Sequence, residues 1–417
     1  MTLQAITAGS PYYRLDSTGS ALQAEAAALR ERGPATLVLL PGDVPAWAVT
    51  DQDLACRLLA GSDLSKDARR HWPAHINGEI PDTWPLRVWT DAVNALTAYG
   101  SDHTRLRRPL AQAFGPRRVS ALVPDIETII RQLLDALQTA GPEDVVDLKA
   151  RFSGQLPLQV VNTLFHTPDH LRSAFSGAVG SLFATDAPPQ EMAEAWRRVH
   201  DLITELIDYK RARPGDDLST ELIAARDAGD LTDQELHDSF LLVIGAGHET
   251  TVNALNHAVI SLLTHPDQLA LATTGQISWK QVVEESLRHQ APVASVVARF
   301  AVRDIADEIT GLTFKQGDVV VMNYAAAGRD PRVHGDDADR FDVTRRSAHK
   351  HLSFGYGAHR CVGAALARIE VHIALQQLFG RFPRLRLAAD RSELTPLPSF
   401  ISNGHTSLPV LLGPTAP

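Results

Sequence analysis

The chain has 417 residues, of which 44% are hydrophobic and 21% are charged, a balance typical of a globular protein with a large core. Its 49 acidic and 40 basic residues give a net charge of −9, which argues against nucleic acid as a partner because phosphate binding needs a basic surplus. The two cysteines, Cys56 and Cys361, are too few for a disulfide framework or a multi-thiolate zinc site.

Helical periodicity dominates the chain. Apolar residues spaced at i, i+3 and i+4 predict helices over residues 20–31, 101–114, 120–139, 191–212, 233–264, 279–289 and 361–381. Fewer and shorter runs predict strands over residues 36–40, 46–50, 298–302, 319–323 and 408–412. No repeat or linker divides the sequence. We therefore expect one mainly α domain with small β-sheets over residues 1–417, with a short flexible N-terminus to about residue 15.

The best-marked helix runs over residues 233–264. Thr232 and Glu235 form a capping-box pattern at its start, and Pro266 stops it. At about 1.5 Å per residue it would extend for roughly 48 Å, so we expect it to cross the core. The N-terminal residues have no basic start followed by an apolar stretch, so we expect no signal peptide, no membrane partner and a cytoplasmic location.

The most specific feature is the segment around the second cysteine, where residues 354–363 read FGYGAHRCVG. Two glycines permit a tight loop, and the apolar pattern that follows predicts a helix beginning at Cys361. The free N–H groups and dipole at a helix start favour a thiolate, and a single thiolate suits ligation of haem iron. The alternative is a buried cysteine packed beside a glycine turn, and we expect that packing role for Cys56.

A second motif lies in the middle of the long helix, where residues 246–251 read AGHETT. The small residues Ala246 and Gly247 leave room for a flat group against the helix, and the adjacent threonines weaken regular helix there. The Thr250 hydroxyl can bond the carbonyl four residues back and open the helix locally. A threonine that is only bonded to its own helix, with Glu249 in a salt bridge, accounts for the pattern equally well.

The cysteine segment resembles the haem-ligand loop Phe-Gly-x-Gly-x-His-x-Cys-x-Gly of the cytochrome P450 superfamily, particularly its soluble actinomycete members. Three more motifs lie earlier in the chain in the order typical of the family, so the resemblance covers essentially the whole chain. It implies the P450 fold, with haem b between the long central helix and the cysteine-loop helix. It also implies Cys361 as the iron ligand, Phe354, Ala246 and Gly247 as haem contacts, and Thr250 and Glu249 as the residues that guide protons to dioxygen.

The resemblance also assigns roles to the remaining motifs. His103 and Arg107, at i and i+4 on one predicted helix face, become contacts to the haem propionates, together with Arg299 and His359. Without the resemblance, this segment would be read as an exposed basic helix face. Glu285 and Arg288 become a buried structural pair, although the spacing alone is typical of a solvated one.

These features predict a monomeric haem-thiolate monooxygenase that hydroxylates or epoxidises an apolar small molecule, such as a polyketide or macrolide, a steroid or a terpenoid. By family analogy, ferredoxin and its reductase supply electrons. We expect ferredoxin to dock on basic residues near the cysteine: Arg345, Arg346, His349, Lys350, His351 and Arg360. A peroxygenase or isomerase, and a non-catalytic haem-thiolate sensor, remain alternatives. A nicotinamide dehydrogenase is disfavoured because the glycine fingerprint is incomplete.

Overall fold

The computed structural model describes residues 11–182 and 189–414, and its mainly helical content with small sheets confirms the predicted fold class. Contacts between Cα atoms group the chain into two compact units. Unit 1 comprises residues 1–104, 284–361 and 396–403, and unit 2 comprises residues 105–283, 362–395 and 404–417. The expected flexible N-terminus falls partly outside the described residues, whereas Tyr13–Arg14 form strand β1.

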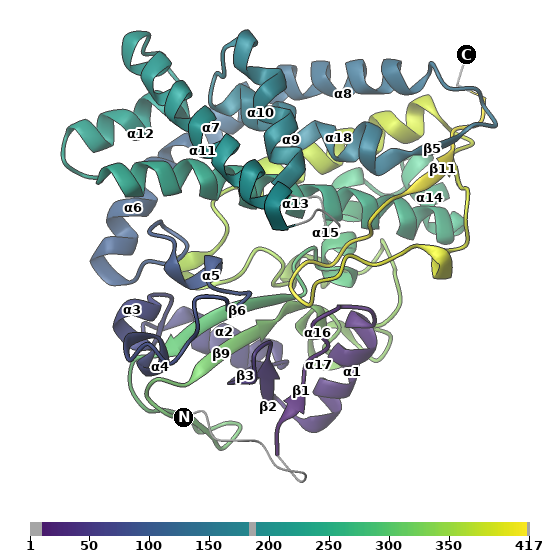
Figure 1. The fold of residues 1–417 in the computed structure, drawn as a ribbon. Coiled ribbons are helices and arrows are strands. Elements are labelled where there is room, and N and C mark those ends of the chain that lie inside the picture. Colours follow the sequence, from purple (N-terminus) through teal and green to yellow (C-terminus); the bar gives the residue numbers. More distant parts are fainter. Residues whose placement is uncertain (1–10, 183–188, 415–417) are drawn as a thin grey trace. The chain divides into compact units, whose positions relative to one another are not determined.

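Unit 1 is built on a six-stranded sheet with the strand order β1-β2-β3-β9-β6-β4 (Figure 1). The strands after β1 are β2 (Ala35–Leu40), β3 (Val44–Val49), β4 (Leu64–Ser65), β6 (Ser295–Ala301) and β9 (Val319–Asn323). A separate two-stranded sheet joins β7 (Ile305–Asp307) to β8 (Leu312–Phe314). The helices of this unit are α1 (Leu22–Arg32), α2 (Gln52–Ala60), α3 (Ala68–His71), α4 (Pro73–Ile76), α5 (Val88–Asp91), α16 (Tyr324–Ala327) and α17 (Pro331–His334).

Strand β6 is irregular at the point where it pairs with β9. The register shifts between Val296 and Arg299, and Ala298 has a φ of +59°, which is unusual for a residue with a side chain. A β-bulge of this kind re-aims the side chain that follows it. The bulge therefore sets the direction of Arg299.

Unit 2 is mainly helical. Its helices are α7 (Pro116–Ala121), α8 (Val123–Leu137), the π-helical turn η1 (Lys149–Ser153), α9 (Gln155–Leu164), α10 (Asp169–Leu182), α11 (Pro189–Ala212), α12 (Leu218–Asp227), α13 (Asp233–Thr264), α14 (Pro266–Thr273) and α18 (Ala364–Arg381). A small sheet has the order β10-β11-β5, from Arg386–Leu387, Pro409–Leu411 and Val145–Asp147. Helices α6 (Gly100–Ala113) and α15 (Trp279–His289) each contribute residues to both units.

Helix α13 has the bounds that the sequence predicts. The Thr232 hydroxyl accepts from the N–H of Glu235, and the Glu235 carboxylate accepts from the N–H of Thr232, so both halves of the capping box form. At the other end, Pro266 opens α14. Most of α13 from Thr251 to Leu262 is buried, and the helix packs against α9 and α18 within unit 2.

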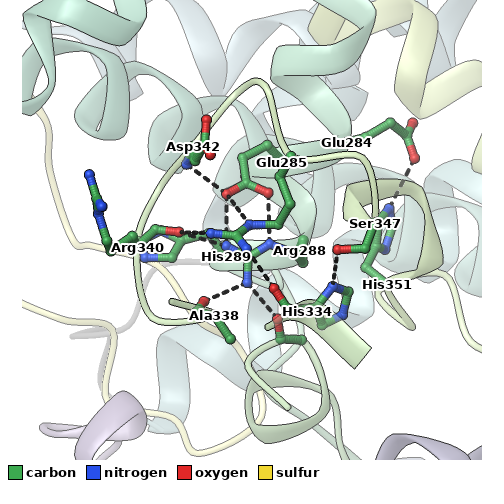
Figure 2. A network of polar contacts seen from close by, with 12 residues as sticks. Glu284, Glu285, Arg288, His289, His334, Ala338, Arg340, Asp342, Ser347 and His351 are labelled. Atoms are coloured by element: carbon green, nitrogen blue, oxygen red, sulfur yellow. Dashed lines mark hydrogen bonds and ion pairs between the residues drawn. The ribbon is translucent and has the colours of Figure 1, made fainter. Parts of the chain in front are cut away.

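A buried ion pair organises part of unit 1, and Figure 2 shows the network around it. The Arg288 guanidinium donates to both carboxylate oxygens of Glu285 at 2.7 Å, and neither side chain is exposed. Its remaining donors reach the carbonyls of Gly328 at 2.7 Å, Ala338 at 2.6 Å and Arg340 at 2.8 Å. The pair is therefore a buried structural element, as the resemblance implies, and ties α15 to two later loops.

We predict that Arg288→Ala lowers the free energy of unfolding by about 3–5 kcal/mol, because the Glu285 carboxylate remains buried without its counter-ion. Arg303→Ala is the control, since the pair between Arg303 and Asp63 is largely exposed and contributes less than about 1 kcal/mol. Denaturant unfolding followed by circular dichroism compares the two variants. Equal losses of stability would contradict the structural role of the buried pair.

Candidate functional site

The cysteine segment forms a loop in unit 1 whose shape depends on its glycines. Gly355 and Gly357 both have left-handed backbones, with φ values of +68° and +70°. A Cβ atom on Gly357 would overlap the carbonyl oxygen of Leu59, so no other residue fits there without movement. The loop closes on itself where the N–H of Cys361 donates to the carbonyl of Phe354 at 2.8 Å. Cys361 is exposed.

The prediction that a helix begins at Cys361 is wrong by three residues. Helix α18 starts at Ala364, and Gly363 is its N-cap residue without a side-chain cap. Val362 and Gly363 form a turn instead, which is consistent with the low helix propensity of glycine. The N–H of Cys361 is therefore used by the loop and not by a first helical turn. Cys56, by contrast, is half-buried in α2 against the core of unit 1, as predicted for a packing residue.

Two of the predicted propionate contacts meet in unit 1. The imidazole rings of His103 and His359 lie with their centroids 4.0 Å apart, although 256 residues separate them in the chain. His103 is buried on α6, and His359 lies in the cysteine loop. Arg107 is half-buried one turn later on α6, in the part of the helix that belongs to unit 2, and the i, i+4 spacing on a continuous helix is the one predicted.

Arg299 is buried in unit 1, where its guanidinium bonds the hydroxyl of Tyr324. Burial lowers the pKa of Arg299, and it raises the pKa of Tyr324, so the tyrosine stays neutral. The Nε atom of Arg299 is buried without a hydrogen-bond partner among the described residues. A buried donor left in this state is costly unless a ligand accepts from it.

Tyr324 and Lys66 belong to this neighbourhood, and sequence reasoning missed both. The Tyr324 hydroxyl faces Gly355, since a Cβ atom on that glycine would lie 3.2 Å from it. Lys66 is almost fully buried, and the charge of Arg299 acts on it. No signal in the sequence marked them as site residues, because lysine is mostly exposed in proteins and the burial of a tyrosine varies.

The helix motif lies in unit 2, in the middle of α13. The Thr250 hydroxyl donates to the carbonyl of Ala246 at 2.7 Å, as predicted, but the helix remains regular from Asp233 to Thr264 and is not opened there. Ala246 is exposed, and a Cβ atom on Gly245 would meet nothing within 4 Å. Gly247 faces a side-chain methyl group of Val161. This face of the helix therefore has free space beside Ala246.

Glu249 lies within the electrostatic reach of Lys149, a lysine on η1 that sequence reasoning missed. Burial lowers the pKa of Lys149, while the Glu249 carboxylate acts in the opposite direction. The Lys149 ammonium donates to the carbonyl of His405 at 2.8 Å, which fixes its position in unit 2. The neighbouring His248 contacts the end of η1, with Nε2 3.0 Å from the carbonyl of Gly154. The charges of Glu249 and Lys149 therefore act on each other.

The predicted basic docking surface is smaller than expected. The Arg345 side chain is only 6% exposed and pairs with Asp337 and Glu285. His351 is buried and contacts Glu284 at 3.2 Å (Figure 2). The prediction is wrong for these two residues, because both side chains face internal carboxylates. Those that remain exposed are Arg346, His349, Lys350 and Arg360.

No helix in the ranges 11–182 and 189–414 is both long and apolar enough to cross a bilayer. The sequence matches the family model described as Cytochrome P450 over residues 45–271 and 279–403. The 2-hydroxy-5-methyl-1-naphthoate 7-hydroxylase of Streptomyces carzinostaticus is 41% identical over 405 residues, which are 96% of this chain and 97% of that protein.

Solved structures give the same result. CYP154A1 from Streptomyces coelicolor A3(2) is 47% identical with a TM-score of 0.88, and the match covers 96% of this chain and 99% of that one. Testosterone-bound CYP154C4 from Streptomyces sp. ATCC 11861 is 39% identical with a TM-score of 0.90, covering 97% and 99%. The chain therefore belongs to the cytochrome P450 family and is a P450 monooxygenase, with the haem-thiolate cofactor that the family implies.

Proposed function

We propose that this enzyme hydroxylates or epoxidises an apolar small molecule, using haem b and electrons from a ferredoxin and its reductase. The observation that carries the proposal is the arrangement in unit 1, where an exposed Cys361 in a glycine-shaped loop accompanies the buried cation Arg299 and the adjacent rings of His103 and His359. A thiol ligand and a cluster of buried cations are the two features that a haem with two carboxylates requires.

The residues present fit this cofactor. Cys361 supplies the thiolate, and the buried Nε of Arg299 has a donor to offer a carboxylate. His103 and His359 add further donors in unit 1, and Phe354 lies in the loop that holds the cysteine. Haem bound through a thiolate supplies activation of dioxygen, because electron donation from sulfur favours cleavage of the O–O bond.

Thr250 and Glu249 then control protons. While the Thr250 hydroxyl donates to the Ala246 carbonyl, its oxygen lone pairs stay available to accept a hydrogen bond from a group beside the helix. The space beside Ala246 and Gly245 admits such a group. Glu249 carries the proton supply, and the Lys149 ammonium stabilises its carboxylate between transfers. The hydrogen bond of Thr250 to its own helix is thus compatible with the proposed role of Thr250 in guiding protons.

The substrate class rests on the relatives. One relative is named for hydroxylating a naphthoate and another was solved with testosterone, so we propose a polycyclic apolar substrate of the steroid or polyketide kind. A panel of both classes, screened for the low-spin to high-spin change in the haem spectrum, identifies binders. A peroxygenase, an isomerase or a haem-thiolate sensor would not need the pair Glu249 and Thr250, which favours the monooxygenase.

We predict that Thr250→Ala uncouples the reaction. With the panel compound that wild type converts best, product per NADPH consumed should fall by about tenfold or more, with peroxide formed instead, because the hydroxyl no longer holds the proton. Thr250→Ser is the matched control and should retain coupling, since it keeps the hydroxyl. The assignment fails if Thr250→Ala converts NADPH to product as efficiently as wild type.

We also predict that the exposed cations near Cys361 dock an acidic ferredoxin. The double variant Arg346→Glu with Lys350→Glu should slow reduction by ferredoxin in low salt by about tenfold or more, and the difference should shrink as salt rises. Arg197→Glu with Arg198→Glu changes the net charge equally on exposed residues of α11 and should leave the rate unchanged. If both double variants slow reduction equally, the effect comes from overall charge, and the proposal of this docking surface is wrong.

A further inference from the structure

His351 precedes the cysteine loop in unit 1 and is buried, with a side chain that is only 1% exposed. Its Nδ1 atom accepts a hydrogen bond from the backbone N–H of Ser353 at 3.1 Å. Its Nε2 atom lies 3.2 Å from a carboxylate oxygen of Glu284 on α15, and Figure 2 shows this contact. One imidazole therefore bridges the start of the loop and a helix.

These two contacts fix the tautomer of the ring. A nitrogen that accepts a hydrogen bond from an N–H group carries no proton of its own, so Nδ1 is the unprotonated atom. In a neutral imidazole the other nitrogen then carries the hydrogen, and Nε2 donates to the Glu284 carboxylate. His351 thus acts as an acceptor toward the loop and as a donor toward the helix.

The residues that follow His351 extend these contacts to the cysteine. The Ser353 hydroxyl donates to the carbonyl of Leu287 at 2.6 Å, which ties the same residue to α15 a second time. The ring of Phe354 lies beside that of His351, with the centroids 5.8 Å apart. The carbonyl of Phe354 accepts from the N–H of Cys361 at 2.8 Å. A continuous series of contacts therefore leads from α15 to the residue proposed to bind iron.

Helix α15 is itself held firmly at this point. Glu285, the neighbour of Glu284, forms the buried pair with Arg288, whose guanidinium also reaches three backbone carbonyls. A side chain orients a metal ligand well when a rigid element supports it and its own hydrogen bonds fix its direction. His351 meets both conditions, so loss of its Nδ1 acceptor would loosen the loop rather than the helix.

We propose that His351 is a positioning residue for Cys361, which holds the cysteine loop in the form that binds haem iron through a thiolate. The proposal rests on the proposed function, in which Cys361 supplies this ligand. It adds a residue outside the segment that resembles the haem-ligand loop, and it gives His351 a role in the interior in place of the docking role that the sequence predicted.

Two substitutions separate the two ring nitrogens. In His351→Asn the side-chain oxygen can replace Nδ1 as the acceptor, whereas the longer amide of His351→Gln reaches toward Glu284 and leaves the N–H of Ser353 without that acceptor. The purified holoproteins are reduced, given carbon monoxide and warmed, and the red-shifted Soret band of thiolate ligation is followed over time. His351→Gln should lose the band at least about tenfold faster than wild type, and His351→Asn should lose it at nearly the wild-type rate.

His334→Gln is the matched control, because His334 is another buried histidine of unit 1 whose ring contacts Ser347 and Gln52, outside the loop. This variant should keep the band for as long as it keeps its circular dichroism. The proposal is overturned if His351→Gln loses the band no faster than His334→Gln, or only as the whole protein unfolds. Equal losses in His351→Gln and His351→Asn would also overturn it.

Hydrogen exchange of the holoproteins, read by mass spectrometry, examines the loop without reference to iron. A peptide that contains Ser353 and Cys361 should exchange faster in His351→Gln than in wild type, while a peptide from the first turns of α15 should be unchanged. Unchanged exchange of the loop peptide would contradict the proposal. If wild type shows no red-shifted band although the loop peptide responds, the ligand assignment in the proposed function is wrong and the contact between His351 and the loop stands.

Discussion

A guanidinium buried in a protein must have its charge compensated and its N–H groups accepted, and Arg288 and Arg299 of unit 1, both buried, meet this requirement differently. The carboxylate of Glu285 and three backbone carbonyls satisfy Arg288 within the chain. Arg299 has only the neutral Tyr324 hydroxyl and retains a buried Nε without a partner among the described residues. The first arginine stabilises the fold, and the second is suited to a ligand with carboxylate oxygens.

Elsewhere in the proposed site, too, some polar groups are satisfied within the chain while others stay available to a ligand. Glycines shape the cysteine loop so that the N–H of Cys361 stabilises the loop through its bond to Phe354. The Cys361 side chain stays exposed and is therefore available to bind a cofactor. In unit 2, the side chains proposed to guide protons are anchored by contacts that leave acceptor atoms available. Thr250 donates to its own helix and keeps its lone pairs, and Lys149 is fixed by the His405 carbonyl while its charge acts on Glu249.

Much of this was predictable from sequence where the signal is local. The capping box and Pro266 fix both ends of α13, and the threonine bond to Ala246 follows from helical spacing. The apolar pattern extends back to Cys361 and predicts a helix there, but Gly363 delays the first turn to Ala364. Features that depend on distant partners were not predictable. The burial of Arg345 and His351 requires Asp337 and Glu284, and the aim of Arg299 requires a bulge at Ala298.

The central claim is that Cys361 holds haem iron through a thiolate. The carbon monoxide complex of the reduced protein tests it most directly, because thiolate ligation shifts the Soret band to the red of its position with a neutral ligand. We predict the red-shifted band for wild type and its loss in Cys361→Ser, with Cys56→Ser unchanged because Cys56 packs in the core of unit 1. A Cys361→Ser protein that binds haem and keeps the red-shifted band would contradict the account.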